Sequence, residues 1–520
     1  MTVKRVFENM SKILSLEALE NIANSTSHPG FILCFGHFNT IHPGHVRHFR
    51  NGKQHAAQLL VAVEGDAQMP EIERDQIFSE EERANAVAVV DLVDFVVILS
   101  DFSLRELVSR IKPSILMLGK EFERDNVGKV SSAITALEGH GGRVIYDAGE
   151  THYASSYLFH NSLGQLETLR WREFQTAMQT QDVSLSHLVE SLTKQPRNQI
   201  LVLGDAIVDR YVACDPVGMS NEAPVVVVKE LETRDYIGGA AIVAGHVKAF
   251  GSNCTFLSVV GEDKEGDFVE NTLQKLGITT NLVRDPERPT TFKMRYMVEN
   301  QKLFRVSRLK EHTVTSSVEA KLIDYLEDMA PSLDAIVVSD FVYGVVSEKI
   351  LETISRLSSR YGIRLFGDVQ CSSQIGNVTR LKGFDLICPT EREARIALVN
   401  HDDGIEYVAN RLISDTRSGN MVMKLGGDGF IAYSTASERS IPRRQYFPAL
   451  TANPVDVAGA GDSLLAAMAV GMTRGFTIME AASLGACVTA IAVQNIGNRP
   501  VELSQVNEFI EKRCGISNEI

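Results

Sequence analysis

A short segment near the end of the chain, Asp456-Val-Ala-Gly-Ala-Gly-Asp462, sets small residues and a carboxylate directly before the apolar run Ser463 to Met472. A small-residue turn that opens a helix leaves backbone N–H groups unpaired, and the helix dipole favours negative charge at the same place. The turn is formed by Gly459, Ala460 and Gly461. Asp462 stands at the helix start, where a carboxylate can take a proton from a substrate hydroxyl. The segment therefore predicts phosphoryl transfer to an alcohol.

A second segment, Gly36-His-Phe-Asn-Thr-Ile-His42-Pro-Gly-His45, carries paired imidazoles at a turn between a strand and a helix. His42 and His45 lie three residues apart, so on a helix they share one face and can both donate to phosphate oxygens. Gly44 lets the backbone approach closely, and the pair Ser155-Ser156 can bind phosphate at a later helix start. These groups can position phosphates and stabilise their negative charge, so the segment predicts a second phosphate-handling site.

The histidines of this region have a second interpretation as metal ligands. They cluster at His37, His42, His45, His48 and His55. No cysteine or acidic residue lies beside them at the spacing of a zinc site, so the pattern does not favour a metal centre. We expect His37, His48 and His55 to be solvated rather than functional.

Alternating strands and helices must position the paired imidazoles. Apolar runs and caps predict strands at residues 31–35, 59–63, 95–99, 115–118 and 143–146, and helices at 11–24, 43–58, 79–90, 103–111 and 130–138. This alternation is typical of a parallel, doubly wound α/β sheet, whose ligands bind at the carboxyl ends of the strands. His42 and His45 follow the first strand, so they fall at such an end.

The chain is long enough for more than one core. Its 520 residues exceed what a single domain usually supports. Residues 161–198 are rich in Gln, Ser, Thr and charge, and we interpret them as a helical linker between domains at 1–160 and 199–520. The second domain also alternates strand and helix, and strand-like segments near 224–236 and 291–308 predict a β lid. The expected fold is therefore two doubly wound parallel-sheet α/β domains, the second with a lid.

Composition excludes several classes of protein. A net charge of −14 argues against a general binder of nucleic acids or anionic membranes. The seven cysteines are scattered without paired spacing, which is typical of reduced thiols in a cytoplasmic protein. The first residues have no long apolar core, and no apolar stretch is long enough and free enough of charge to span a bilayer, so we expect neither signal peptide nor membrane helix.

The first domain resembles a known family. The segment from Gly36 to His45 is similar to the G-x-F-[DN]-x-x-H-x-G-H signature of the nucleotidyltransferase superfamily, and Arg83 and Tyr153-Ala-Ser-Ser156 extend the match. Residues 10–160 resemble most closely the nucleotidyltransferase half of bifunctional ADP-heptose synthases. The resemblance implies that nucleotide and phosphate contacts come from Gly36, Phe38, Asn39, Gly44, Arg83, Lys120, Ser155 and Ser156, with His42 and His45 as catalytic residues.

Departures from that pattern leave the nucleotide open. Heptose enzymes carry Cys and Asp where His37 and Asn39 stand, so either ATP or CTP can be the substrate of this domain. Lys120 lies two positions from the lysine of the family's strand-end segment and would have to replace it.

Residues 199 to about 515 resemble the ribokinase family, and most closely the kinase half of the heptose enzymes. The matching segments are Gly204-Asp-Ala-Ile-Val-Asp209-Arg-Tyr211, Ser220 to Pro224, Gly238-Gly-Ala-Ala241, Ser339-Asp340, Lys424 to Gly429 and the closing G-A-G-D. By family analogy the sugar is held by Asp209, Gly238, Gly239, Lys293 and Arg295, and the base is Asp462. Glu393 would organise Mg²⁺ through water, and the turn with Lys424, Gly426 and Gly429 would lie beside the adenine of ATP.

Four positions of this second domain differ from the family. They are Ile242 for an asparagine, Gln370 for a lysine, Thr390 for an asparagine and Ala458 for a threonine. Each change removes a polar contact or a charge near the ligands, whereas the base and the anion-binding turn remain. We expect an active kinase with altered sugar specificity.

The sequence thus predicts a bifunctional enzyme that makes a nucleotide-activated sugar of the ADP-heptose type. The domain order is the reverse of that in the heptose enzymes. Two alternatives stay open: a nucleotidyltransferase whose kinase-fold domain only senses sugar or dimerises, and a non-catalytic assembly protein that binds nucleotides. Lids of such kinases often pair between subunits, so we expect a homodimer through residues near 215–236 and 291–308, without nucleic-acid or membrane partners.

Overall fold

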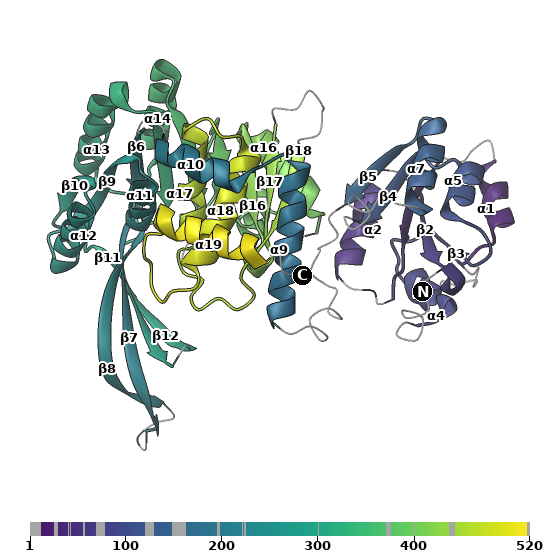
Figure 1. The fold of residues 1–520 in the computed structure, drawn as a ribbon, viewed down its shortest axis with the longest axis horizontal. Helices are drawn as coiled ribbons and strands as arrows, with labels where there is room; N and C mark the ends of the chain where they lie inside the picture. Colours follow the sequence, from purple (N-terminus) through teal and green to yellow (C-terminus); the bar gives the residue numbers. More distant parts are fainter. Residues whose placement is uncertain are drawn as a thin grey trace, which may run out of the picture. The chain divides into compact units, whose positions relative to one another are not determined.

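The computed structural model describes residues 12–24, 30–39, 41, 43–55, 58–68, 78–119, 129–147, 163–194, 198–220, 222, 225–299, 301–370, 376–400, 402–435 and 443–516. The chain divides into two compact units (Figure 1). The first is Met1–His160 with Asn400–Val408, and the second is Asn161–Val399 with Ala409–Ile520.

The first unit is built on a five-stranded parallel sheet with the order β3-β2-β1-β4-β5. Its strands are β1 (Phe31–Gly36), β2 (Gln58–Glu64), β3 (Phe95–Leu99), β4 (Ile115–Gly119) and β5 (Arg143–Asp147). The chain builds outward from β1 in one direction and then crosses to β4, so the carboxyl end of β1 is a topological switch point where α/β sheets bind ligands.

Helices cover both faces of this sheet. They are α1 (Leu16–Ala23), α2 (Pro43–His55), α4 (Glu80–Ala88), α5 (Leu104–Ile111) and α7 (Lys129–Gly139), with the short 3₁₀ helix η1 (Asp66–Gln68). Leu19, Leu107 and Leu137 from α1, α5 and α7 form one apolar layer. Phe49 and Ala84 from α2 and α4 form the layer on the opposite face. The doubly wound α/β prediction is confirmed for this unit.

The second unit has a nine-stranded sheet with the order β10-β9-β6-β13-β14-β15-β16-β17-β18. Its strands are β6 (Gln199–Gly204), β9 (Asn253–Gly261), β10 (Thr279–Asp285), β13 (Ala335–Asp340), β14 (Arg364–Val369), β15 (Leu386–Ile387), β16 (Asn420–Lys424), β17 (Gly429–Ser434) and β18 (Arg443–Pro448). The strands from β10 to β16 are parallel, as expected. β17 and β18 pair antiparallel at the edge, which the sequence pattern did not indicate.

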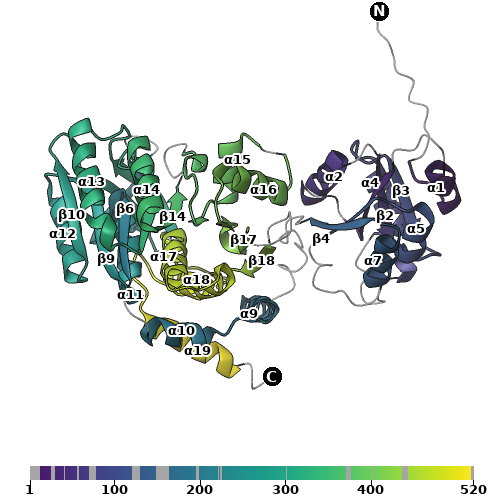
Figure 2. The same cartoon turned by 90° about the horizontal axis from the view of Figure 1, so that it is seen from above.

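Helices also cover both faces of the large sheet (Figure 2). They are α11 (Ala240–Ala249), α12 (Lys264–Lys275), α13 (Ser316–Met329), α14 (Glu348–Tyr361), α15 (Glu391–Leu398), α16 (Ile405–Thr416), α17 (Ala460–Thr473), α18 (Ile478–Ala492) and α19 (Leu503–Ile516), with 3₁₀ turns η2 (Ala330–Ser332), η3 (Val378–Arg380) and η4 (Gly426–Asp428). α11, α17 and α18 lie on one face, and α13 and α14 on the other. Every residue of α17 from Asp462 to Met472 is buried, which fixes this helix firmly.

A separate four-stranded sheet forms the predicted lid and projects from the large sheet (Figure 1). Its order is β12-β11-β7-β8. The strands are β7 (Ala206–Met219), β8 (Val226–Gly239), β11 (Thr291–Val298) and β12 (Gln301–Arg308). β7 starts two residues after β6, so the lid and the large sheet share a corner at Asp205, whose carboxylate accepts bonds from the amides of Phe341 and Tyr343.

The segment interpreted as a linker packs into the second unit. It forms α9 (Leu163–Thr180) and α10 (Leu185–Lys194). Trp171 and Phe174 of α9 and Leu188 of α10 belong to the same buried cluster as α17 and α18. These helices are therefore part of the core of the second unit.

Candidate functional sites

The small-residue turn lies at the N-terminus of the buried helix α17. Gly459 has a φ of 78°, and a Cβ on it would stand 2.4 Å from Asn498 Oδ1, so only glycine suits this position. Within the described chain, the amides of Gly461 and Asp462 have no hydrogen-bond acceptor, while the Ser463 amide donates to the Gly459 carbonyl at 2.9 Å. The turn therefore presents the donors that a phosphate group requires.

Asp462 is buried at the start of this helix and is held by one neighbour. Gln370 Nε2, at the end of β14, donates to Asp462 Oδ1 at 2.8 Å. Burial and the nearby carboxylate of Asp368 raise the pKa of Asp462 to about 7, although Lys424 and the bond from Gln370 oppose the shift. A carboxylate that titrates near neutral pH is suited to accept the proton of a hydroxyl group.

An ion pair supports the turn from below. Lys424 Nζ, at the end of β16, donates to Asp368 Oδ2 at 2.6 Å, and both residues are buried or nearly so. A Cβ on Gly461 would lie 3.3 Å from Lys424 Nζ, so the anion-binding turn rests against this lysine. Burial raises the pKa of Asp368 to about 6, despite the lysine. The structure thus brings Lys424, Gly461 and Asp462 together, whereas the sequence resemblance placed Lys424 beside the adenine.

Asp209, which the resemblance predicted to hold the sugar, lies on lid strand β7. Arg295 of β11 donates to its Oδ1, and Asn498 Nδ2 donates to its Oδ2 at 3.1 Å. A Cβ on Gly238 would stand 2.3 Å from Asp209 Oδ2, so the glycine makes room for the carboxylate. Gly239 has a φ of 60° and starts α11. These predicted sugar-site residues lie together.

The two basic residues predicted for the sugar site share one face of the lid. The strand register pairs Lys293 with Asp209 and Arg295 with Tyr211. Lys293 Nζ lies 5.1 Å from the ring centres of Phe341 and Tyr343. Arg295 lies 5.2 Å above the ring of Tyr211. Cation–π contacts of this kind hold the charges in place beneath the lid.

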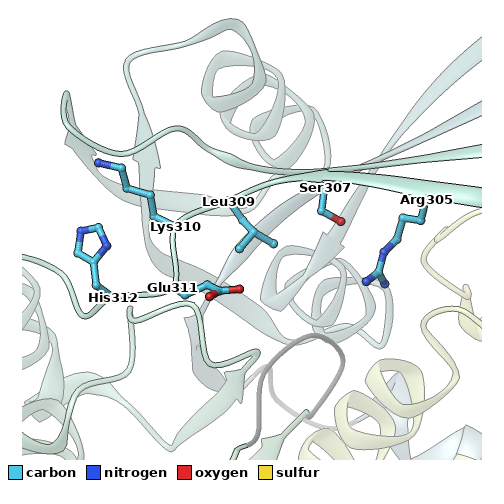
Figure 3. Close-up of a pocket in the computed structure, with 6 residues that line it drawn as sticks. All are labelled: Arg305, Ser307, Leu309, Lys310, Glu311 and His312. Atoms are coloured by element: carbon cyan, nitrogen blue, oxygen red, sulfur yellow. The ribbon is translucent and has the colours of Figure 1, made fainter.

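The same face continues onto strand β12. Arg305 pairs with Arg295 and Ser307 with Lys293. Both line a hollow of about 660 Å³ at the base of the lid (Figure 3). Its other lining residues are Leu309, Lys310, Glu311 and His312. A mainly basic hollow therefore adjoins the residues predicted to bind sugar, and sequence reasoning did not find it.

Asp456 is a further residue that the sequence left without a role. Its Oδ2 accepts a bond from the Tyr211 hydroxyl at 2.6 Å, and its Oδ1 accepts from Lys302 Nζ at 2.8 Å and from the Ala458 amide at 3.1 Å. Tyr211 and Lys302 are lid residues, so this carboxylate joins the lid to the anion-binding turn. The sequence did contain one indication of a role for Asp456, because it lies six residues before Asp462 in the same small-residue segment.

Glu393 lies at the start of α15 and also completes a capping box. Its Oε2 accepts the Thr390 amide at 2.7 Å, while the Thr390 hydroxyl accepts the Glu393 amide at 3.1 Å. Asp368 Oδ1 is buried without a partner among the described residues. Among those residues no three potential ligands lie close enough to hold a metal alone. Mg²⁺ typically keeps waters and substrate phosphates and takes one or two carboxylates, so Glu393 and Asp368 fit that ion.

The four positions that depart from the ribokinase pattern differ in their surroundings. Ile242 is fully buried in the apolar core. Gln370 contacts the base, and Thr390 caps α15. Ala458 contributes its backbone amide to Asp456. Ile242 was predicted to remove a hydrogen-bonding group from the sugar; its side chain belongs to the apolar core cluster, and the loss of that bond stays a prediction.

In the first unit, the loop after β1 is arranged around aromatic and histidine side chains. Phe38 has a φ of 50°, is buried, and meets the His45 ring edge-on with 5.0 Å between centres. His37 Nδ1 lies 3.0 Å from Glu64 Oε2. Asn39 Oδ1 accepts the Phe78 amide at 2.8 Å. His45 and Gly44 lie on α2, directly after the switch-point strand that ends at Gly36.

Some predicted residues of this site lie outside the described part of the chain. They are His42, Lys120, Ser155 and Ser156. Their predicted roles stay untested.

Arg83 is placed differently from a ligand-facing arginine. Its side chain is fully buried. It donates to the carbonyls of His37 at 2.6 Å, Glu64 at 2.8 Å and Phe78 at 2.9 Å, and to Asp66 Oδ1 at 2.6 Å. The guanidinium thus ties the loop after β1 to the ends of neighbouring segments. This geometry favours a positioning role over direct phosphate contact.

Comparisons with known proteins match both units of the chain to known families. Residues 33–146 match the model of the cytidylyltransferase-like family. Relatives named bifunctional protein HldE are 28% identical over 60% of this chain in Nitratiruptor sp. and 29% identical over 62% in Campylobacter jejuni. The matches span less than two thirds of those proteins, 64% and 66% of their lengths. These matches confirm the predicted resemblance to the heptose enzymes.

Solved structures show the fold of the second unit. Phosphofructokinase-2 from Escherichia coli, in complex with substrates and products, superposes with a TM-score of 0.52 at 16% identity, covering 61% of this chain and 100% of that one. A complex of the same protein with fructose-6-phosphate gives a TM-score of 0.50 at 15% identity, covering 62% and 100%. The model of the pfkB family carbohydrate kinases matches residues 197–503, more than half of the chain. The chain therefore belongs to the pfkB family of carbohydrate kinases.

Proposed function

We propose that the chain is a bifunctional enzyme that makes a nucleotide-activated sugar. The second unit phosphorylates a sugar or sugar phosphate with MgATP. The first unit joins a sugar 1-phosphate to ATP or CTP and releases pyrophosphate. The two family models and the relatives named bifunctional protein HldE support this pairing. By resemblance to the heptose enzymes, the substrate is similar to a heptose 7-phosphate and the product to ADP-heptose.

The observation that carries the kinase proposal is the position of Asp462. Its carboxylate lies at the N-terminus of α17, beside amides that have no acceptor in the described chain, and burial raises its pKa to about 7. In the proposed reaction it takes the proton of a sugar hydroxyl while the oxygen attacks the γ-phosphorus of ATP. The amides of Gly461 and Asp462 stabilise the negative charge of the migrating group, and ADP leaves.

Charges beneath the lid support a phosphorylated sugar as substrate. Asp209, which accepts hydrogen bonds from the sugar hydroxyls, lies on the same face of the lid as Lys293, Arg295 and Arg305. Arginine and lysine are the side chains that bind phosphate most readily. The hollow beside Arg305 is wide enough for a phosphate at the far end of a sugar.

In the first unit the proposal rests on the switch-point end of β1. His45 and the predicted partner His42 donate to the phosphates of the nucleotide, and Arg83 holds the backbone at His37, between β1 and α2. Catalysis consists of positioning and charge stabilisation, as nucleotidyl transfer requires. Mg²⁺ would screen the phosphates in the kinase site, held by Glu393 through water and by Asp368.

We further propose a homodimer formed through the lid. β8 and β12 are the edge strands of the four-stranded sheet, and they expose Val226, Leu231, Phe304 and Val306. Exposed apolar edge strands pair readily with another chain. Among the described helices none has the length and apolar character needed to cross a membrane. A cytoplasmic location, where ATP is available, completes the proposal. A sedimentation mass equal to one chain would contradict the dimer.

The two activities can be tested separately in the full chain. A mixture of sugar phosphates is incubated with Mg²⁺ and ATP or CTP, and the products are identified by mass spectrometry. Asp462→Asn should abolish ADP formation and leave pyrophosphate release from a supplied sugar 1-phosphate intact. His45→Ala should do the reverse. Asp324→Asn and His187→Ala, which change exposed residues of the second unit, are matched controls.

The outcomes separate the alternatives. Pyrophosphate release without any ADP formation would leave a nucleotidyltransferase with a kinase-fold domain that only binds sugar or dimerises. Neither product with any sugar phosphate, together with no nucleotide binding, would refute both activities.

A further inference from the structure

Helix α9 lies outside the family match but inside the core of the second unit. The pfkB match begins at residue 197, whereas α9 spans Leu163–Thr180. Phe174 is fully buried and stands 6.3 Å from the ring of Phe447 on β18. Trp171 is nearly buried and stands 6.2 Å from the ring of Phe509 on α19. This helix is thus an addition to the kinase fold that is firmly packed.

The polar side of α9 reaches two turns at one end of the large sheet. Arg170 Nη1 donates to the Thr451 carbonyl at 2.9 Å, and its Nη2 donates to the Gly427 carbonyl at 3.2 Å. Glu167 Oε1 accepts the Ala452 amide at 3.3 Å. Gly427 lies in η4, between β16 and β17, and Thr451 follows β18. One guanidinium therefore joins two loops that are separate in sequence.

The turn at Gly427 has little packing of its own. A Cβ on Gly426 or on Gly427 would meet no atom within 4 Å, so side-chain contacts do not define the shape of the turn. Hydrogen bonds must hold it instead. Arg170 donates to the Gly427 carbonyl, the Tyr446 hydroxyl and the Ala449 amide donate to the Asp428 carbonyl, and the Leu425 amide donates to the Gly429 carbonyl. The turn begins two residues after Lys424, against which the anion-binding glycine Gly461 rests.

We propose that α9 braces the nucleotide-binding turns of the kinase, with Arg170 as a positioning residue for ATP. This inference rests on the proposed kinase function, in which the turn after Lys424 lies beside the adenine. The planar guanidinium suits the task because it presents several donors in a fixed fork and can hold two carbonyls at once. Without that fork the Gly426–Asp428 turn samples more conformations. Binding of ATP must then order the turn, and the entropy cost lowers the affinity for ATP.

The sole tryptophan offers a direct reporter. The chain has one Trp, residue 171, adjacent to Arg170 on α9. If α9 contacts the nucleotide turns as the distances indicate, a saturating nucleotide changes the environment of this helix. Emission from Trp171 should then change on titration of the full chain with Mg²⁺ and a non-hydrolysable ATP analogue.

The test compares Arg170→Ala with Arg172→Ala in the full chain. Arg172 is exposed on the same helix, so its loss is a matched control. We expect Arg170→Ala to raise the KM for ATP of the kinase reaction about tenfold and to weaken the Trp171 response equally, with the KM for sugar unchanged. Arg170→Lys should fall between, because lysine keeps the charge but not the fork. Pyrophosphate release by the first unit and the melting curve serve as checks on folding.

Each result has one meaning. An ATP KM and Trp171 titration unaltered in Arg170→Ala, while the wild-type chain phosphorylates sugar, would overturn the brace and leave the kinase proposal intact. Equal losses in Arg170→Ala and Arg172→Ala would also overturn it. A wild-type chain that neither forms ADP nor responds to the analogue would refute the kinase proposal itself, and the brace with it.

Discussion

The contact between Gln370 and Asp462 allows the sharpest prediction. Gln370 Nε2 donates to Oδ1 of the base at 2.8 Å, where the ribokinase pattern carries a lysine. A hydrogen bond to the charged form of a carboxylate lowers its pKa. The other groups that act on the base are Asp368 and Asp209, which raise its pKa, and Lys424, which lowers it. Gln370→Ala removes one stabilising contact and should raise the pKa of Asp462 above its value of about 7.

The size of the effect follows from the energy of the bond. A hydrogen bond to a charged group contributes about 1.5–3 kcal/mol. One pKa unit corresponds to about 1.4 kcal/mol, so the shift should be about one to two units. A base with a pKa of about 7 is half ionised at pH 7. A rise of about one unit leaves roughly a tenth ionised, so kcat/KM for sugar should fall about fivefold at pH 7 and recover above about pH 9.

The assay measures ADP formation between about pH 5.5 and pH 9.5 and fits kcat/KM for sugar at each pH. Gln370→Lys places a positive charge beside the base and should move the profile in the opposite direction, toward lower pH. Gln274→Ala changes an exposed glutamine of α12 and should leave the profile unaltered. A loss in Gln370→Ala that is equal at every pH would refute the reasoning, because damage to the fold does not follow the ionisation of one carboxylate.

Three further predictions use the same contacts. Asp462→Asn should raise the melting temperature more at pH 8 than at pH 5. The pKa of Asp462 is raised from its ordinary 3.8 to about 7 in the folded chain, so its ionisation costs the folded state up to about 4 kcal/mol, a cost that is small at pH 5 and fully present above pH 7. An equal gain at both pH values would contradict this prediction. Gly238→Ala should raise the KM for sugar at least tenfold and leave the KM for ATP nearly unchanged, because the added Cβ would lie 2.3 Å from Asp209 Oδ2. Equal increases in both KM values would argue against sugar binding at Asp209. Arg83→Lys should abolish nucleotidyl transfer and lower the free energy of unfolding of the first unit by about 3 kcal/mol in calorimetry, because the buried guanidinium donates to the His37 and Glu64 carbonyls. ADP formation by the second unit should persist. A normal melting curve would show that the guanidinium is dispensable.

Local sequence patterns were sufficient for most elements of the first unit. The apolar run at residues 31–35 became β1, because a buried parallel strand reads as a continuous apolar stretch bounded by Gly30 and Gly36. Ser79 and Glu82 form a capping box, which places the start of α4 within one residue of the expected position. The anion-binding turn was also predictable, since Gly459, Ala460 and Gly461 precede an apolar helix.

Contacts between distant segments could not be predicted in the same way. Asn498 donates to Asp209 across 289 residues of sequence, and Tyr211 donates to Asp456 across 245. No local pattern encodes such pairs, because they depend on how the lid closes over the large sheet. The polar composition of residues 161–198 concealed the few large apolar side chains, Trp171 and Phe174 among them, that bury α9. The average polarity of a segment says little about its burial when only one face of a helix makes the contact.

The four departures from the ribokinase pattern differ in how they affect the proposed kinase site. Ile242 lies in the apolar core, and its predicted loss of a hydrogen bond to the sugar stays a prediction. Thr390 still caps α15 and keeps Glu393 in position, and Ala458 contributes its backbone amide, which every residue except proline possesses. Only Gln370 alters a contact to the base, and it replaces a charge by a hydrogen bond that still favours the ionised carboxylate. The proposed base and the proposed anion-binding turn therefore remain, and these substitutions favour a kinase with a shifted pH profile over a kinase-fold domain without activity.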